Sequence, residues 1–352
     1  MKAAKWFGCT LFAFFGLLGG VQAQIQSAKV VLRNASLLFA LVALGYSTLG
    51  IAAQIYPYKS IRLIVPFAPG GTNDIIARLI AAKLHEALGR PVVVDNRGGA
   101  SGVIGTELAA KASPDGYTLL IVNLNLVTNP VLFKKLPYDT LRDLSTVSLL
   151  ATSPTVLAAS RSLPIKSVRE LIAYAQAKPL QLTYGTSGMG TTTHIPMELL
   201  ISMTGIKIVP VHYRGGGPML IDLIAGRLSP SFTTILSVMP YLQAQRLRAL
   251  AVSTSKRSSA LPDIPTLAES GVPGYEFAGW WGVVAPAGTP PSIIATLNAQ
   301  LGKILAQDDV RKSLTDEGAD PEHSSPEQFL VYIRAEITKW SKVMKDANIQ
   351  AE

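Results

Sequence analysis

Four short turns rich in glycine and hydroxyl side chains stand out in this chain, each between an expected strand and an expected helix. They span residues 69–74, 96–102, 185–194 and 213–218. Such a turn presents unpaired backbone N–H groups at the positive end of a helix dipole, where an anion binds. Threonine and serine hydroxyls either cap the helix or add donors to the anion. Any one turn is also an ordinary helix start, but four together predict a shared anion-binding cleft.

Sequence signatures of catalysis are weak. The chain has neither the glycine-rich phosphate loop ending in Gly-Lys-Ser/Thr nor a Gly-x-Gly-x-x-Gly turn opening a helix. Ser187 sits in a segment like a nucleophile elbow, but Met189 stands where that motif requires glycine. His194 and His212 lie near turns without a cysteine or carboxylate at metal-ligand spacing. We therefore expect no catalytic residue, metal or cofactor, and keep a serine hydrolase built on Ser187 and His194 as a rival.

The turns are positioned by an alternation of short β-branched runs with helix-period segments, which is typical of a parallel sheet covered on both faces. The expected strands are 61–67, 91–95, 117–123, 147–159, 182–185, 207–213, 228–234, 247–254 and 282–286. The expected helices are 73–88, 102–111, 167–178, 193–203, 218–227, 238–245, 291–306 and 326–347, and the stretch 124–146 is read as irregular. This number of elements predicts two α/β lobes, with the C-terminal part returning to the first.

The N-terminal 53 residues have the organisation of an export signal. Two apolar runs, 6–21 and 35–53, each follow basic residues and end in small ones. We expect cleavage after Ala53 and a periplasmic location, with a retained membrane anchor as the alternative. Residues 1–53 contain four basic and no acidic residues, so removing them lowers the net charge from +9 to about +5. This modest excess does not indicate nucleic-acid binding, and loss of Cys9 leaves no thiol.

From residue 56 to about 348 the chain resembles the substrate-binding receptors of tripartite tricarboxylate transporters, the Bug family. The resemblance rests on a set of short motifs in a characteristic order and spacing. They are 61–71 with Asp74, Ala77 and Arg78; 96–97 with Gly99, Ala100, Gly102 and Gly105; 114–120; 136–139; 213–215; 248–252; 265–266 with Glu269; and 285–290.

The resemblance implies a periplasmic-binding-protein-like fold of the Venus-flytrap type, with a ligand cleft between two lobes joined by crossing strands. It implies capture of a small carboxylate, held by backbone groups, hydroxyls and ordered waters, and delivery to the membrane subunits of a tripartite transporter. We place the first lobe at 54–155 plus 256–352 and the second at 156–255, and expect a monomer. Ligand binding would close the lobes.

The expected ligand-binding residues combine the turns with the family pattern. They are Gly70, Gly71, Thr72, Asn73, Asp74, Ser101, Thr186, Ser187, Gly188, Gly190, Thr191, Thr192, Tyr213, Gly215 and Thr233. Asp74 has a second interpretation as a charge that stabilises a helix start, and Trp280 and Trp281 are interpreted as core packing or as a pocket wall.

The chain departs from the family at three positions. Gly98 and His212 stand where proline is usual, and Thr233 where an aspartate is common. Without that carboxylate an amine-bearing ligand is less expected, so the ligand is not carried over from relatives. A sensor that binds the same ligands and signals to a kinase stays open as a second role.

Overall fold

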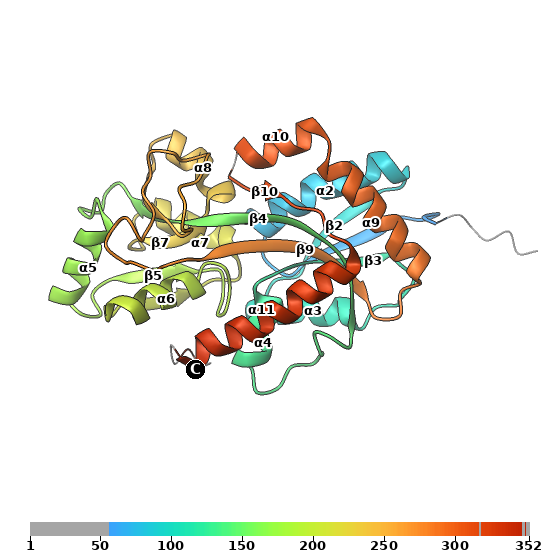
Figure 1. The fold of residues 1–352 in the computed structure, drawn as a ribbon, viewed down its shortest axis with the longest axis horizontal. Helices are drawn as coiled ribbons and strands as arrows, with labels where there is room; N and C mark the ends of the chain where they lie inside the picture. The colour runs from blue at the N-terminus through green and yellow to red at the C-terminus, as the bar shows by residue number, and fades with distance from the viewer. Residues whose placement is uncertain (1–55, 317, 347–348, 350–352) are drawn as a thin grey trace, which may run out of the picture. The chain divides into compact units, whose positions relative to one another are not determined.

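The structure is a computed structural model and describes residues 56–316, 318–346 and 349. A mixed sheet of order β10-β4-β9-β3-β1-β2 forms the first lobe, with β1 between β3 and the edge strand β2 and with helices on both faces (Figure 1). Its elements are β1 (Ile61–Val65), α2 (Thr72–Leu88), β2 (Val92–Asn96), η1 (Ala100–Gly102), α3 (Val103–Ala110), β3 (Thr118–Asn123), α4 (Asn125–Leu132), the first part of β4 (Leu144–Ser160), β9 (Ala278–Pro286), α9 (Pro291–Leu305), α10 (Asp308–Asp316), β10 (Asp320–Pro321) and α11 (Pro326–Asp346).

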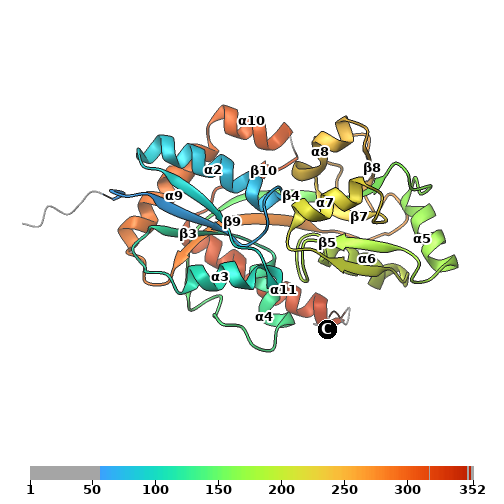
Figure 2. The ribbon, with the colours of Figure 1, turned by 180° about the vertical axis from the view of Figure 1, so that it is seen from behind.

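The second lobe lies at the other end of the long strands β4 and β9, which cross from one group of elements to the other in both views (Figures 1 and 2). Its elements are α5 (Val168–Ala177), β5 (Thr183–Thr186), α6 (Ile195–Thr204), β6 (Val209–His212), α7 (Gly216–Ile224), β7 (Ser231–Thr234), α8 (Ile235–Gln243) and β8 (Leu247–Val252). The predicted fold class, a two-lobed α/β architecture of the periplasmic-binding-protein type, is confirmed.

Strand β4 connects the two lobes because it pairs with strands of both. β1 pairs in parallel with β2 and β3, and β3 pairs antiparallel with β9. β4 pairs with β9 up to Pro154 and with β7 and β8 from Thr155 onward. The parallel pair β5–β6 forms a separate sheet. Because β1 and β3 run in parallel, their carboxyl ends meet at one edge, where the first turns lie.

Strand β1 and helix α2 show why the local sequence forms these elements. The side chains of Ile61, Leu63, Ile64 and Val65 are fully buried, as expected for a strand covered on both faces. Helix α2 buries one apolar face, and Gly89 ends it in the left-handed conformation with its N–H on the His85 carbonyl. Helix α2 therefore begins at the first glycine-rich turn and ends at Gly89, which adopts the left-handed conformation.

The interpretation of 124–146 as irregular was wrong, because α4 lies within it. Pro130 obscured the helical pattern, since an interior proline removes one N–H of the helix. The carbonyl that this N–H would have met, on Leu126, instead accepts a hydrogen bond from Thr140 Oγ1 at 3.0 Å. The prediction also missed α10 and β10 and began β9 four residues late.

The tandem tryptophans lie inside β9, so successive side chains point to opposite faces. Trp280 packs in the core that includes Phe329, and Trp281 in the core under α2. Both are fully buried, which supports core packing. Trp280 Nε1 donates to Glu336 Oε2 at 3.0 Å, and Trp340 Nε1 donates to the same oxygen at 2.8 Å.

Glu336→Leu is expected to lower the free energy of unfolding by about 2–3 kcal/mol, because two buried indole N–H groups lose their acceptor. Glu336→Gln keeps a carbonyl oxygen at the site and should lose less than about 1 kcal/mol. Chemical denaturation of both variants checks this. Equal stability losses would mean that the charge, not the accepted hydrogen bonds, holds α11 on β9.

The predicted signal region, with its cleavage after Ala53, lies outside the described residues. Within the described part of the chain, no helix is both long and apolar enough to cross a membrane. The lobe boundaries drawn from the sequence at 155 and 255 stay a prediction.

Candidate ligand-binding site

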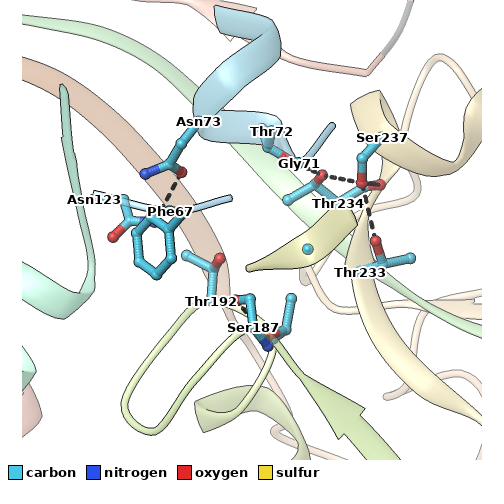
Figure 3. Close-up of a pocket in the computed structure, with 12 residues that line it drawn as sticks. Phe67, Gly71, Thr72, Asn73, Asn123, Ser187, Thr192, Thr233, Thr234 and Ser237 are labelled. Atoms are coloured by element: carbon cyan, nitrogen blue, oxygen red, sulfur yellow. Dashed lines mark hydrogen bonds between the residues drawn. The ribbon is translucent and has the colours of Figure 1, made fainter. Parts of the chain in front are cut away.

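Three helices begin at one cavity between the lobes, here called the polar cavity. Helix α2 starts there after Gly71, α7 starts at Gly216, and α8 follows Thr234. Among the described residues, no side chain caps any of these three starts. The polar cavity is lined by Phe67, Gly71, Thr72, Asn73, Asn123, Ser187, Thr192, Thr193, Gly216, Thr233, Thr234 and Ser237 (Figure 3). Because uncapped helix starts carry partial positive charge, their convergence favours an anion.

Hydroxyl groups form a connected row along one wall of the polar cavity. Thr72 Oγ1 hydrogen-bonds Thr234 Oγ1, which lies 2.9 Å from Ser237 Oγ. Ser237 Oγ is in turn 3.0 Å from Thr233 Oγ1. Figure 3 shows this row, with Ser187 and Thr192 on another side of the cavity. Hydroxyls that rotate can donate to an anion or accept from a neutral group.

Asn73 is held with its amide in one orientation. Its Oδ1 accepts from Asn123 Nδ2 at 3.0 Å and from Trp281 Nε1 at 2.8 Å. Trp281 and the Asn123 amide are donors, so the oxygen of Asn73 must face them. Its Nδ2 is buried and has no hydrogen-bond partner within the described chain. The two donors therefore fix the orientation of the Asn73 amide and leave its buried N–H without a partner among the described residues.

None of the described residues that line the polar cavity carries an ionisable side chain. Asp74 follows Asn73, but its carboxylate is used within the first lobe. It accepts from Gly70 N at 3.0 Å, Asn96 Nδ2 at 3.0 Å and Arg78 Nε at 3.0 Å. Burial alone would raise the pKa of Asp74, but these hydrogen bonds hold it below its ordinary value. Asp74 thus stays ionised as a structural charge, which fits its second interpretation.

A second chamber adjoins the polar cavity and shares Phe67 and Ser187 with it. Its volume is about 310 Å³, against about 30 Å³ for the polar cavity. The second chamber is lined by Phe67, Gly99, Ala100, Ser101, Gly102, Phe133, Ser187, Gly188, Met189, His212, Tyr213 and Arg214. The site therefore has a small hydroxyl-rich part and a larger part with apolar and aromatic walls.

The turns of the two lobes meet directly around these spaces. Ala68 N donates to the Arg214 carbonyl at 2.9 Å, and Thr128 Oγ1 donates to the Gly190 carbonyl at 2.8 Å. Gly188 has φ of +133°, and a Cβ there would lie 3.1 Å from Ser101 Oγ. Glycine is needed at that position for both reasons. All four glycine-rich turns thus come together at one cleft.

The structure distributes the predicted ligand residues unevenly. Gly71, Thr72, Asn73, Ser187, Thr192 and Thr233 line the polar cavity, and Ser101, Ser187, Gly188 and Tyr213 line the second chamber. The predicted residues that line neither are Gly70, Asp74, Thr186, Gly190, Thr191 and Gly215. Hydrogen bonds of these residues shape the turns: Thr191 Oγ1, for instance, donates to the Gly188 carbonyl at 2.7 Å. Direct ligand contact by any of these residues stays a prediction.

Several lining residues were not among the predicted ligand residues, although some of them lie within the four predicted turns. In the polar cavity they are Phe67, Asn123, Thr193, Gly216, Thr234 and Ser237, and in the second chamber Phe67, Gly99, Ala100, Gly102, Phe133, Met189, His212 and Arg214. One signal was present: Asn123 is a polar residue ending an apolar strand, at the sheet edge where ligands bind.

The geometry gives no support to a Ser187–His194 pair. Ser187 Oγ lies 2.9 Å from Thr193 Oγ1, and His194 Nδ1 accepts from Gly190 N at 3.2 Å. Burial, followed by the nearby His212, lowers the pKa of His194 to about 3. His194 Nε2 lies 3.6 Å from Glu198 Oε1, away from the hydroxyl that a base would activate. His194 is instead part of the support behind the 185–194 turn.

His194→Gln is expected to flatten the fall in stability on acidification. A histidine with a lowered folded pKa destabilises the fold as pH drops below its unfolded value of about 6.5 toward 3. The slope reaches about 1.4 kcal/mol per pH unit for one proton. Glu198 acts oppositely, because burial raises its pKa and its contribution is lost as pH rises.

Because His194 and Glu198 act in opposite directions, the informative quantity is the difference in free energy of unfolding between His194→Gln and the unchanged protein at each pH. Urea denaturation between pH 7 and 4.5 measures it. Parallel stability curves for the two proteins would contradict a neutral buried His194.

Two lobes joined by crossing strands, with a cleft lined by helix starts and hydroxyls, define a solute-binding receptor. The profile of the family described as "Tripartite tricarboxylate transporter family receptor" matches residues 76–349. The chain belongs to this family, which is one of solute-binding receptors.

Relatives and solved structures agree with this assignment. Protein BugT of Bordetella pertussis is 37% identical over 319 residues, covering 89% of this chain and 98% of that protein. The structure "R. palustris Rpa4515 with adipate" is 42% identical with a TM-score of 0.81, over 83% of this chain and 98% of that chain. "MatC (Rpa3494) from Rhodopseudomonas palustris with bound malate" is 33% identical with a TM-score of 0.79, over 82% and 99%. The named ligands of both structures are carboxylates.

Proposed function

We propose that this protein is a periplasmic receptor that captures a small carboxylate in the cleft between its lobes and delivers it to the membrane subunits of a tripartite transporter. The observation that carries the proposal is the convergence of the α2, α7 and α8 starts on one cavity lined by uncharged donors. Similarity to structures named with adipate and malate supports the choice of a carboxylate over other anions.

The binding chemistry follows from the site. The polar cavity, at about 30 Å³, has room for a group on the order of two water molecules. A carboxylate head is of this size and accepts several hydrogen bonds at once. Hydroxyls of Thr72 and Ser187 and the fixed amide of Asn73 supply donors from both lobes. An anion held by neutral donors and helix starts is bound without a buried counter-charge, which eases its release.

Lobe closure couples binding to delivery. The contacts between Ala68 and Arg214 and between Thr72 and Thr234 join the lobes across the cleft. A ligand that touches both lobes binds this arrangement more tightly than an open one and shifts the population toward it. In this proposal the receptor binds its ligand and releases it chemically unchanged.

A thermal-shift screen tests the proposal, using protein isolated from the periplasm of cells expressing the full chain. A ligand that binds only the native state raises the melting temperature according to its affinity and concentration. We expect a rise with one class of carboxylates and none with the corresponding amides. Absence of any shift, from folded protein free of copurified ligand, would overturn the carboxylate site. Unchanged uptake of the identified acid after gene deletion would favour the sensor role over transport.

A further inference from the structure

The turn at 99–102 holds two residues other than glycine in the left-handed region of backbone conformation. Ala100 has φ of +47° and Ser101 has φ of +53°. This region is unfavourable for residues with a side chain, because the Cβ atom crowds the following carbonyl oxygen. Both residues line the second chamber, so the backbone strain lies at the ligand cleft. Contacts from outside the turn must hold it in this conformation.

Helix α4 supplies contacts that hold the turn. Asn125 Nδ2 donates to the Ser101 carbonyl at 2.9 Å, and Asn129 Nδ2 donates to the same carbonyl at 3.2 Å. The two asparagines stand four residues apart, which places them on one face of the helix. Both side chains are fully buried. Two buried donors from one helix thus fix the direction of the Ser101 carbonyl.

The other end of each amide makes no comparable contact. The Oδ1 atoms of Asn125 and Asn129 are buried and accept no hydrogen bond within the described chain. Leucine, which has a similar size, would avoid these two unpaired acceptors, so the packing of α4 alone does not favour asparagine. What the two donors do to Ser101 explains these residues better.

The position of Ser101 matters because its turn touches the second lobe. A Cβ on Gly188 would lie 3.2 Å from Ser101 Cα, so the backbones of the two turns approach each other closely. Helix α4 also reaches the turn of the second lobe, where Thr128 Oγ1 donates to the Gly190 carbonyl at 2.8 Å. One short helix therefore holds both turns where they meet.

We propose that Asn125 and Asn129 are positioning residues for ligand binding, which hold the 99–102 turn in its strained conformation so that Ser101 meets Gly188 when the lobes close. The turn is then ordered before a ligand arrives, and affinity rises because binding does not have to order it. This inference rests on the proposed function and concerns the affinity of the same site.

The double variant Asn125→Leu/Asn129→Leu removes both donors and keeps side chains of similar size. Its melting temperature should change little, because two unpaired acceptors are lost together with two donors. Hydrogen exchange at Gly102, whose N–H donates to the Gly99 carbonyl at 3.0 Å, should be about tenfold faster. Calorimetric titration with adipate and malate, the acids named for two similar structures, should show binding about tenfold weaker. Asn125→Leu alone should weaken it about threefold.

Asn298→Leu is the matched control for the loss of an amide donor. Asn298 Nδ2 donates to two backbone carbonyls, those of Val147 and Ser324, and the residue lines neither the polar cavity nor the second chamber. Because it is independent of the cleft, this variant should keep the Kd within about twofold of the unchanged protein.

Ala100→Gly tests whether the two amides act by holding strain. Glycine adopts positive φ readily, so the turn should depend less on α4. Adding both leucines to Ala100→Gly should therefore weaken binding only about twofold or less. Gln245→Gly relieves the same kind of strain, at φ of +55°, on an exposed residue that lines neither cavity. It should leave the effect of the two leucines unchanged.

Two results would overturn the inference. One is unchanged affinity and exchange in the double-leucine variant, and the other is an equal loss of affinity with and without Ala100→Gly. If neither acid binds the unchanged protein, the titrations speak against the proposed function, whereas hydrogen exchange at Gly102 still decides whether the two amides hold the turn.

Discussion

Replacement of Asn73 by leucine will lower the free energy of unfolding by about 3–5 kcal/mol and abolish measurable carboxylate binding. The stability loss follows because Trp281 Nε1 and Asn123 Nδ2 both donate to Asn73 Oδ1 in a buried setting. Each unpaired buried donor costs about 1–3 kcal/mol. The binding loss follows from the proposed function, in which the partnerless amide N–H of Asn73 donates to the bound carboxylate. Chemical denaturation and titration with the best acid measure the two effects.

Asn73→Asp separates the two roles of this side chain. Aspartate keeps oxygen acceptors for Trp281 and Asn123, so the protein should fold with a much smaller loss than the leucine variant. It replaces the amide donor by a negative charge, which repels a bound carboxylate by about 4 kcal/mol at 4 Å and an effective dielectric constant of 20. Binding should weaken at least 100-fold. Retained affinity in Asn73→Asp would show that the anion lies elsewhere in the cleft.

The turns could be predicted from the sequence because their signal is local. Glycines beside threonine, serine and asparagine mark a helix start wherever the chain goes, and Gly71, Thr72, Asn73 and Ser187 do line the polar cavity. The strand–helix alternation is equally local, so the fold class followed from it. Where a local rule was broken, as by Pro130 in α4, the prediction failed.

The missing half of the site depends on contacts between segments far apart in sequence. Thr234 and Ser237 belong to β7 and α8, and only the pairing of β7 with β4 brings them opposite Thr72. Phe133 follows the helix that the prediction missed, and it reaches the second chamber only once α4 is formed. The hydrophobic periodicity of one segment predicts a helix or a strand, but it does not predict which two turns come into contact. The size and apolar character of the second chamber were therefore beyond sequence reasoning.

Gly217→Ala is expected to weaken ligand binding by about 10- to 100-fold while leaving the ligand-free protein as stable as before or slightly more so. A Cβ at position 217 would lie 2.2 Å from the Pro69 carbonyl oxygen across the cleft. Backbone cannot yield as a flexible side chain does, and overpacking of this kind costs about 1–3 kcal/mol. The clash exists only when the lobes touch, so it acts on the closed form. In the open form the alanine favours the first turn of α7 by up to about 1 kcal/mol.

Gly216→Ala is the matched control for this effect. It lies one residue earlier in the same helical turn, and its added Cβ would be 3.4 Å from Gly71 Cα, which is close to ordinary contact. The two variants change the same atoms in the same helix and differ in what the new methyl group meets. Because Gly216 itself lines the polar cavity, titration should show some loss of affinity for Gly216→Ala and a clearly larger loss for Gly217→Ala. Equal affinities would mean that ligand is bound without the direct approach of Pro69 to α7, so that closure stops short of the contact seen between the two lobes.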